Sequence, residues 1–273
     1  MINYPAMYAG LAVLSADYLW LSIAWNGTVF CAVGRTPSYS AGAVMTSPDG
    51  VAWAMQAQPT GGMLAYDIAW NGTVFCAVGT NLASASRSFT STNGVTWTPN
   101  TMANNARSNL AWNGTVFCSV GSGAVCQTSP DGVSWTARSA SNNSNWTGIA
   151  ALGSLFCMVS YSGTSFRGAT SSDNGATWVG RAALAGTWSG IGAGGGTFVI
   201  LPGYSTNAAT TADGVTVTAR TLPYSNSFEN AAYGGTTFCA VTANYSFVST
   251  DAGATWLRYA MPTGNWALSL IHI

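Results

Sequence analysis

The chain has 273 residues, of which only 6% are charged, and its formal net charge at pH 7 is zero. An average soluble protein has about a quarter of its residues charged. Zero net charge gives no electrostatic footprint for nucleic acid, and no apolar run approaches the ~20 residues of a membrane helix. No Lys or Arg precedes the first apolar stretch, so we expect no secretory signal.

The first elements along the chain are four short strands joined by tight turns. Strand A covers 22–25 and ends at Asn26-Gly27, a strong hairpin signal because both central residues of such a turn favour positive φ. Strand B covers 28–33, a loop covers 34–42, strand C covers 43–47 and strand D covers 51–55. Four antiparallel strands of this kind form one propeller blade, and no stretch shows a sustained helical period.

Two motifs from this first unit recur along the chain. IAWNGTVFCAVG at 23–34 returns at 68–79, as LAWNGTVFCSVG at 110–121, and in weaker copies that begin at Ile149, Ile191 and Ala231. The shared Phe lies at positions 30, 75, 117, 156, 198 and 238. The second motif, SPDGVAW in its first copy, alternates with the first without exception. A repeat of about 42 residues is in the range of a four-stranded blade, so the sequence predicts an all-β propeller.

We expect six complete blades with remnants of a seventh. The repeats lie at about 20–60, 61–104, 105–143, 144–184, 185–224 and 225–261, within a single domain over 1–267. Pro262-Thr263-Gly264 matches Pro59-Thr60-Gly61, which leads into strand A of repeat two, and 6–9 falls where a strand D is expected. The last six residues, LSLIHI, are the in-frame translation of CTGTCTCTTATACACATC, a transposase adapter end used in sequencing libraries. We interpret 268–273 as translated adapter; a short apolar strand is the alternative.

The second motif resembles the Asp-box (BNR repeat) of sialidase-like propellers. SSDNGATW at 171–178 and STDAGATW at 249–256 match the pattern S-x-D-x-G-x-T-W, and the other four copies are one residue shorter. The resemblance covers about residues 20–260 and implies a propeller, but it says little of activity, since Asp-boxes occur in enzymes and non-enzymes. The short copies, together with WNGTVF, also resemble propeller modules of bacteriophage tails and virions, which implies a virion or extracellular location.

We expect the second motif to be structural. Its Ser and Asp can bond to N–H groups of their own turn, its Gly supplies positive φ, and its Trp buries apolar area between blades. The residues are Ser47, Asp49, Trp53, Ser91, Asn93, Trp97, Ser129, Asp131, Trp135, Ser171, Asp173, Trp178, Thr211, Asp213, Ser249, Asp251 and Trp256. Val217 replaces the Trp in repeat five. Only Asp17, Asp67 and Glu229 remain for catalysis by carboxylates.

Metal and cofactor chemistry is not expected. The one His, His272, lies in the last six residues, so the chain offers no His-based triad and no His/Cys zinc site. A single carboxylate in each turn supplies too few of the roughly 6–8 oxygen ligands that calcium requires. Five Cys share one repeat position that Val199 fills in repeat five, which indicates a small buried hydrophobe. We expect no disulfides among these five. If 121–123 is a hairpin loop, Cys118 and Cys126 are direct cross-strand neighbours, close with or without a bond.

A binding site is predicted on the long loops. The B–C and D–A loops share the face opposite the second motif, and loops on a rigid scaffold commonly carry binding residues. The candidates are Arg35, Tyr39, Arg107, Trp146, Tyr161, Arg167, Trp188, Tyr204, Tyr224, Phe228 and Glu229. Trp146, Trp188 and Phe228 lie ten positions before the shared Phe. Either they pack under the loops, or they form a ring of stacking surfaces for a sugar or a peptide.

These patterns favour a non-enzymatic binding or structural module that contacts a host glycan or another protein. The alternatives are a sialidase-like extracellular glycoside hydrolase and a pure assembly scaffold. The hydrolase needs an arginine cluster, but the family's F-R-I-P motif is absent. Arg138, Arg181 and Arg220 each follow the box aromatic position by three residues, so they are a repeat feature. Neither a nucleic-acid partner nor membrane insertion is expected.

Overall fold

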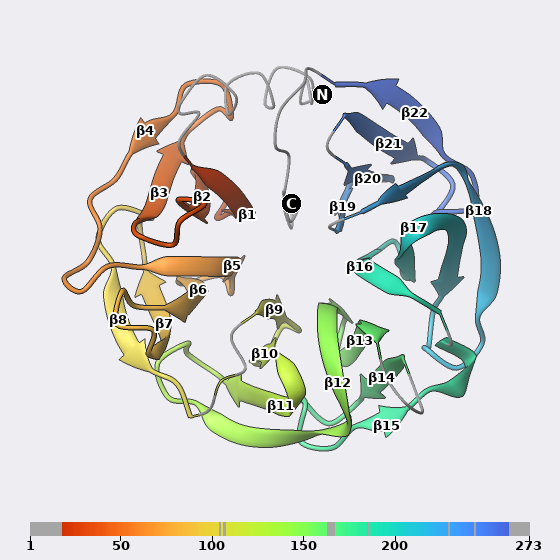
Figure 1. Ribbon diagram of the computed structural model, residues 1–273, viewed down its shortest axis with the longest axis horizontal. Helices are drawn as coiled ribbons and strands as arrows, with labels where there is room; N and C mark the ends of the chain where they lie inside the picture. The colour runs from red at the N-terminus through yellow and green to blue at the C-terminus, as the bar shows by residue number, and fades with distance from the viewer. Residues whose placement is uncertain are drawn as a thin grey trace.

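The computed structural model describes residues 18–261 apart from 104, 106, 107, 163–166, 185, 229 and 243. The strands succeed one another around a central axis and form an all-β propeller, as predicted (Figure 1). The one helical element among these residues is a 3-10 turn, η1 (Ala182–Leu184). In the same residues, no helix has the length and apolar character that a membrane crossing requires. The expected extra strand at 6–9, the seventh repeat and the 268–273 segment lie outside the described residues.

Each sequence repeat contributes strands from the axis outward. The innermost strands are β1 (Leu19–Trp25), β5 (Leu64–Trp70), β9 (Asn109–Trp112), β12 (Thr136–Leu152), β16 (Trp188–Gly194) and β19 (Ala231–Gly234). The next are β2 (Phe30–Arg35), β6 (Phe75–Thr80), β10 (Phe117–Val120), β13 (Leu155–Ser162), β17 (Thr197–Thr211) and β20 (Thr237–Val241). Then come β3 (Gly42–Ser47), β7 (Ser86–Ser91), β11 (Ser122–Ser129), β14 (Gly168–Ser171) and β21 (Tyr245–Ser249). The outer strands are β4 (Ala54–Met55), β8 (Thr98–Thr101), β15 (Val179–Gly180), β18 (Thr218–Ser227) and β22 (Leu257–Ala260).

The strands pair into five sheets rather than into six separate ones. Three sheets have four strands, β1–β4, β5–β8 and β19–β22; β16–β18 form a three-stranded sheet and β9–β15 a seven-stranded one. The large sheet joins repeats three and four because β12 first pairs with β11 and then continues inward to pair with β13. In β17, the first part pairs with β16 and the part after Gly203 pairs with β18. Repeats three, four and five therefore do not each form a separate four-stranded sheet.

Copies of the second motif fold into a common turn, which we call the Ser-Asp turn. In the first copy, Ser47 Oγ accepts the N–H of Gly50 at 2.8 Å and donates to Asp49 Oδ1 at 3.0 Å. The Trp53 indole N–H donates to the Gly50 carbonyl oxygen at 3.1 Å. The Ser, Asp and Trp of this motif therefore have the structural contacts that the sequence predicts for them.

The Ser-Asp turn also moves the start of the outer strand to a later residue than predicted. Asp49 Oδ1 accepts the N–H of Val51 at 2.8 Å and that of Ala52 at 2.9 Å. These two residues are held in the turn, so β4 begins at Ala54 and not at the predicted Val51. The Asn26-Gly27 turn also differs from its prediction, which had positive φ at both residues. Only Gly27 has positive φ, because the preceding Asn caps the turn with its side chain.

Acid is expected to destabilise the protein through the two longer turns. The hydroxyl and N–H of Thr177 lower the pKa of Asp173 from about 3.8 to about 2, and Thr255 does the same for Asp251. Because the folded-state pKa is depressed, these carboxylates stabilise the fold above about pH 4, and this contribution is lost as the pH falls towards 2. Urea midpoints measured across this range should fall.

The matched control is the double variant Asp173→Asn, Asp251→Asn. Asn93 occupies the equivalent position in repeat two, where its Oδ1 accepts the N–H groups of Val95 and Thr96. The double variant should keep a folded turn but show a shallower fall of the urea midpoint. An identical pH dependence in both proteins would contradict the role assigned to these carboxylates.

In repeats two to six, the Gly of the Ser-Asp turn packs against the preceding repeat. A Cβ added to Gly132, whose φ is 76°, would lie 2.9 Å from Cys76 Sγ and 3.0 Å from Thr90 Cγ2. A Cβ on Gly94 would likewise meet Cys31 Sγ at 3.3 Å. The equivalent glycines of the later repeats are Gly175, Gly214 and Gly253. Positive φ and close approach both favour glycine here. The second motif of one repeat therefore docks on the first motif of the repeat before it.

None of the six cysteines, all of which are described, forms a disulfide, and all are buried. This confirms the expectation for the repeat position. Cys126 lies opposite Val120, and Cys118 lies opposite Thr128, so the two cysteines are diagonal neighbours and not directly paired as predicted. Burial raises the pKa of Cys126 to about 11 and that of Cys157 to about 12.

Thiol reagents are expected to leave the native protein unlabelled at neutral pH. The thiolate is the reactive form, and burial raises the pKa of these thiols well above neutrality. Titration with a chromogenic disulfide reagent should find six thiols in denaturant. Rapid labelling of the native protein, or fewer than six thiols after unfolding, would contradict this assignment.

Candidate binding face and central channel

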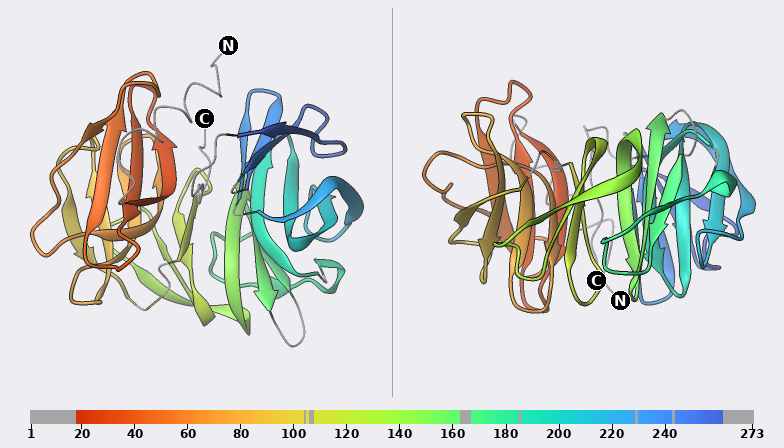
Figure 2. Two further views of the ribbon diagram at one scale, coloured as in Figure 1. Left: turned by 45° about the horizontal axis from the view of Figure 1, so that its top comes forward. Right: turned by 90° about the horizontal axis from the view of Figure 1, so that it is seen from below.

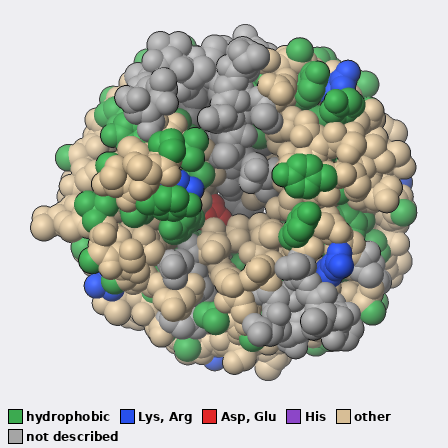
Figure 3. Space-filling view, viewed as in Figure 1, with side chains coloured by type: hydrophobic (Ala, Val, Ile, Leu, Met, Phe, Trp, Pro, Cys, Tyr) green, Lys and Arg blue, Asp and Glu red, His purple; other side chains and the backbone are tan. Residues whose placement is uncertain are grey.

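The two faces of the propeller differ in charge. The strands run across the thickness of the disc, so their ends define its faces (Figure 2). The carboxylates of the Ser-Asp turns are exposed: Asp49, Asp131, Asp173, Asp213 and Asp251. In the view of Figure 3 an acidic side chain is seen only in the central hollow, whereas basic and large apolar side chains are spread around it. Because Ser-Asp turns and B–C loops lie at opposite strand ends, this is the face of the B–C and D–A loops, hereafter the loop face.

Four of the predicted ligand-binding residues are exposed tyrosines. Tyr39 and Tyr204 are 51% and 73% exposed, and Tyr161 and Tyr224 are each 45% exposed. Tyr39 and Tyr204 have φ values of 59° and 61°, which bulky residues rarely adopt. The Tyr161 ring packs on Gly203, where an added Cβ would lie 2.7 Å from it. The Tyr161 ring therefore lies against the backbone that carries Tyr204.

Two predicted arginines are held by neutral groups. The Arg35 Cζ lies 3.6 Å from the centroid of the Tyr39 ring, and its Nη1 donates to a carbonyl oxygen of the same loop. Arg167 Nη1 donates to the Gly186 carbonyl oxygen at 3.1 Å and to Thr187 Oγ1 at 2.9 Å. Both guanidinium groups are thereby positioned without a carboxylate in these contacts. Arg107 and Glu229 lie outside the described residues.

Three predicted ligand-binding residues are buried instead. Trp146, Trp188 and Phe228 are 3%, 6% and 0% exposed. The Trp188 indole N–H donates to the Leu184 carbonyl oxygen at 2.8 Å, and Phe228 lies edge-on to Phe247 with ring centroids 4.8 Å apart. Their assignment as stacking surfaces is wrong for this structure, because no ring face is open to a ligand. The alternative, packing under the loops, applies to all three.

The arginines of the outer strands do not converge on a site. Arg138 Nε donates to Thr128 Oγ1, and Arg220 Nε donates to Thr210 Oγ1. Arg181 makes the equivalent bond within its own sheet. Each contact repeats at its own position around the ring, so these arginines do not form the carboxylate-binding cluster that a sialidase-like enzyme requires.

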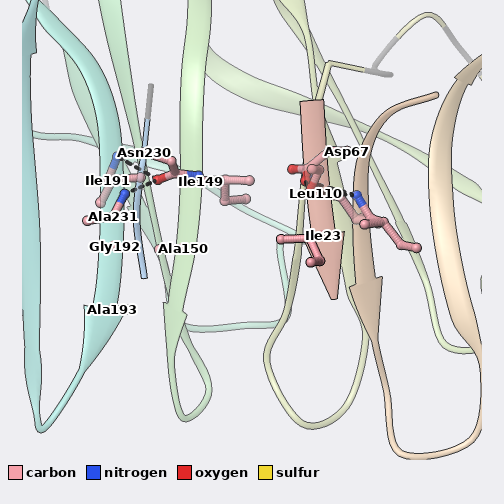
Figure 4. Close-up of a pocket in the computed structure, with 12 residues that line it drawn as sticks. Ile23, Asp67, Leu110, Ile149, Ala150, Ile191, Gly192, Ala193, Asn230 and Ala231 are labelled. Atoms are coloured by element: carbon pink, nitrogen blue, oxygen red, sulfur yellow. Dashed lines mark hydrogen bonds between the residues drawn. The ribbon is translucent and has the colours of Figure 1, made fainter. Parts of the chain in front are cut away.

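A belt of hydrogen bonds joins the innermost strands, and the sequence analysis did not predict it. Asp67 accepts the hydroxyl of Ser22 at 2.6 Å and the N–H of Leu110 at 2.7 Å, and Asn230 accepts the N–H of Ile191 at 3.2 Å (Figure 4). Asn109 Nδ2 donates to the Trp146 carbonyl oxygen, and Thr147 Oγ1 donates to the Trp188 carbonyl oxygen. We call this set the axial belt. It links each innermost strand to the next from the first repeat to the sixth.

The axis itself leaves little free space at the level of the belt. A cavity of about 20 Å³ is lined from all six repeats by Ser22, Asp67, Leu110, Ile149, Ile191 and Asn230, among others. That volume is room for about one water molecule. This cavity is too small for a sugar or a peptide, so the loop face is the better candidate. No group of three His, Cys, Asp or Glu among the described residues could hold a metal ion.

Comparisons with known proteins support the fold alone. Neither a protein-family profile nor a curated protein matches the sequence. A streptogramin B lyase structure is 12% identical with a TM-score of 0.73 and covers 93% of this chain and 87% of its own. Selenomethionine-substituted virginiamycin B lyase from Staphylococcus aureus is 11% identical with a TM-score of 0.73, and the match covers 92% of this chain and 88% of that one. YCF48 bound to D1 peptide is 14% identical with a TM-score of 0.64, and the match covers 89% of this chain and 82% of that one. The propeller fold is thus shared with a lyase and with a peptide-bound protein.

Proposed function

We propose that the protein is a non-catalytic binding module that holds a protein or glycan partner on its loop face. The observation that carries this proposal is the exposure of Tyr39 and Tyr204 at positive φ. Such a backbone conformation costs about 1–3 kcal/mol and tends to cluster at functional sites. Tyrosine is also enriched in interfaces, since it offers a large contact area for little side-chain entropy.

We further propose a six-bladed ring of the Asp-box class, in which the third and fourth blades share β12. The repeated Ser-Asp turn supports the class. Ring closure is supported by one hydrophobic cluster in which Trp20 and Ile23 of the first repeat pack with Cys239 and Val241 of the sixth. A phage tail or virion origin rests on the resemblance of the short turns. The hydrolase alternative would draw its carboxylates from Asp17, Asp67 and Glu229. Of these three, only Asp67 lies among the described residues, and both its oxygens accept hydrogen bonds within the belt.

Tyr204→Ala is the test of this function. The variant should lose at least ~10-fold in binding of a glycan or protein ligand found by array screening, because Tyr204 is 73% exposed and such side chains often carry interface energy. Its melting temperature should not change, since exposed substitutions rarely alter stability by more than ~0.5 kcal/mol. Binding and thermal unfolding are measured on the same preparations.

Val133→Ala provides the matched control. Val133 is also exposed, at 46%, but it lies in a Ser-Asp turn on the opposite face. Its variant should bind as the unmodified protein does. The proposal would be contradicted if Tyr204→Ala bound the ligand as tightly as the unmodified protein does. It would also be contradicted if neither a glycan array nor a protein array yielded a ligand. Turnover of a fluorogenic glycoside panel would support the hydrolase in its place.

A further inference from the structure

Arg258 lies between two tyrosine rings at the rim of the propeller. Its Cζ is 4.8 Å from the ring centroid of Tyr224 and 4.5 Å from that of Tyr245, and the two rings are 5.8 Å apart. The three residues come from β18, β21 and β22, which are neighbours in Figure 1. The cluster therefore fixes a guanidinium group across the junction between the last two sheets.

The guanidinium of Arg258 is unlike those of the outer-strand arginines. Arg138, for example, follows its Trp by three residues and bonds to Thr128. Arg258 follows Trp256 by two, so its side chain points to the other side of its strand. It is exposed and makes no hydrogen bond or ion pair within the described residues. Stacking uses the faces of the planar group, which leaves its edge N–H groups available for a carboxylate.

The strand that carries Arg258 has one edge that pairs with no other described strand. β22 ends its sheet and pairs only with β21 among the described strands. All four of its residues are exposed, and Tyr259 next to Arg258 is 51% exposed. An open edge offers N–H and C=O groups to an extended peptide, and opposed residues on paired strands lie about 5 Å apart at Cβ. A sugar chain has no backbone to match that edge.

We propose that β22 and the Tyr224–Arg258–Tyr245 cluster bind an extended acidic segment of a protein partner, with a carboxylate of that segment on the Arg258 guanidinium. The inference rests on the proposed function and names its partner. Charge favours it, because the loop face shows basic side chains around the central hollow and an acidic side chain only within that hollow (Figure 3). Tyrosine and arginine are also the residues that most often carry binding energy in protein interfaces.

The test uses a fluorescein-labelled peptide of five Thr-Glu units and its Thr-Gln counterpart in fluorescence anisotropy. The full chain should bind the Thr-Glu peptide at least ~10-fold more tightly than the Thr-Gln peptide, and less tightly as salt is raised. Arg258→Gln should lower affinity for the Thr-Glu peptide by ~10-fold or more. Arg138→Gln, which removes one charge from a hydrogen-bonded outer-strand site, should leave it unchanged.

Three outcomes would overturn the proposal. One is equal affinity of Arg258→Gln and the unmodified protein, with melting temperatures confirming that both are folded. A second is tighter binding of a hyaluronan oligosaccharide than of the Thr-Glu peptide, which would indicate an acidic glycan. The third is salt-sensitive self-association in sedimentation that Arg258→Gln removes, which would make the Ser-Asp face of a second copy the occupant. If Tyr204→Ala still abolishes array binding, the proposed function stands and only this inference falls.

Discussion

Replacing Trp188 with alanine is expected to lower the free energy of unfolding by about 3–5 kcal/mol. The side chain is 6% exposed and packs in one cluster with Ile191 and Phe198. Its loss leaves a cavity and deprives the Leu184 carbonyl oxygen of its indole donor. Urea unfolding followed by tryptophan fluorescence and circular dichroism measures the change.

Trp188→Phe and Tyr204→Ala are the controls for this effect. Phenylalanine refills part of the cavity without restoring the indole N–H, so we expect an intermediate loss of stability. Tyr204→Ala removes a side chain of similar size from an exposed position and should change stability by no more than ~0.5 kcal/mol. A Trp188→Ala protein of unchanged stability that has lost ligand binding would restore Trp188 to the binding site.

Asp67→Ala is expected to cost about 1–3 kcal/mol of stability. The carboxylate accepts the N–H of Ile68 at 2.9 Å as well as those hydrogen bonds that join it to Ser22 and Leu110. Removing it leaves the buried N–H of Leu110 without that acceptor, at about 1–3 kcal/mol. The N–H of Ile68 keeps a second acceptor, Ser22 Oγ, at 3.3 Å. Thermal unfolding and hydrogen exchange at Leu110 would both report the loss.

Asp67→Asn isolates the geometry from the charge. Asn109 and Asn230 occupy the equivalent position in repeats three and six, eight residues before the shared Phe. An amide oxygen can therefore act as acceptor in the axial belt, and we expect less than half of the alanine effect. Equal losses for Asn and Ala would show that the negative charge, and not hydrogen bonding, stabilises this position.

The repeat pattern was sufficient to predict the propeller but not its sheet boundaries. Alternating apolar residues and turn residues mark where strands occur, as in β2 and β3. They carry no information on whether an outer strand stops before the next inner strand starts. In β12, residues between Ser139 and Asn145 stay in extended conformation, so hydrogen bonding passes from one repeat to the next.

The candidate site was predicted in part, and burial separates the successes from the failures. An aromatic residue near a loop reads the same in sequence whether it packs inward, as Trp146 does, or outward, as Tyr204 does. The choice depends on the neighbouring repeat, which covers Trp146 but leaves Tyr204 bare. Position alone could not distinguish them, because Trp146 lies within β12 and Tyr204 within β17.

The amino-acid sequence contains a pattern from which the axial belt could have been predicted. The position eight residues before the shared Phe is polar in four repeats, although the innermost strands are otherwise mostly apolar. The residues are Ser22, Asp67, Asn109 and Asn230. A polar side chain among buried neighbours must find a partner. The partners, however, are backbone groups of the adjacent repeat, and sequence does not reveal which of them lie within reach.

The docking of each Ser-Asp turn on the preceding repeat has a consequence for how such a chain can change length. Gly94 on Cys31 and Gly132 on Cys76 are the same contact made twice, so the surface that one repeat offers fits any repeat that precedes it. The first three copies of the first motif are nearly identical in sequence. Unequal recombination between their coding segments would join repeats that already match. Rings that differ by one unit could thus arise in a single genetic step, with every new junction packed from the start.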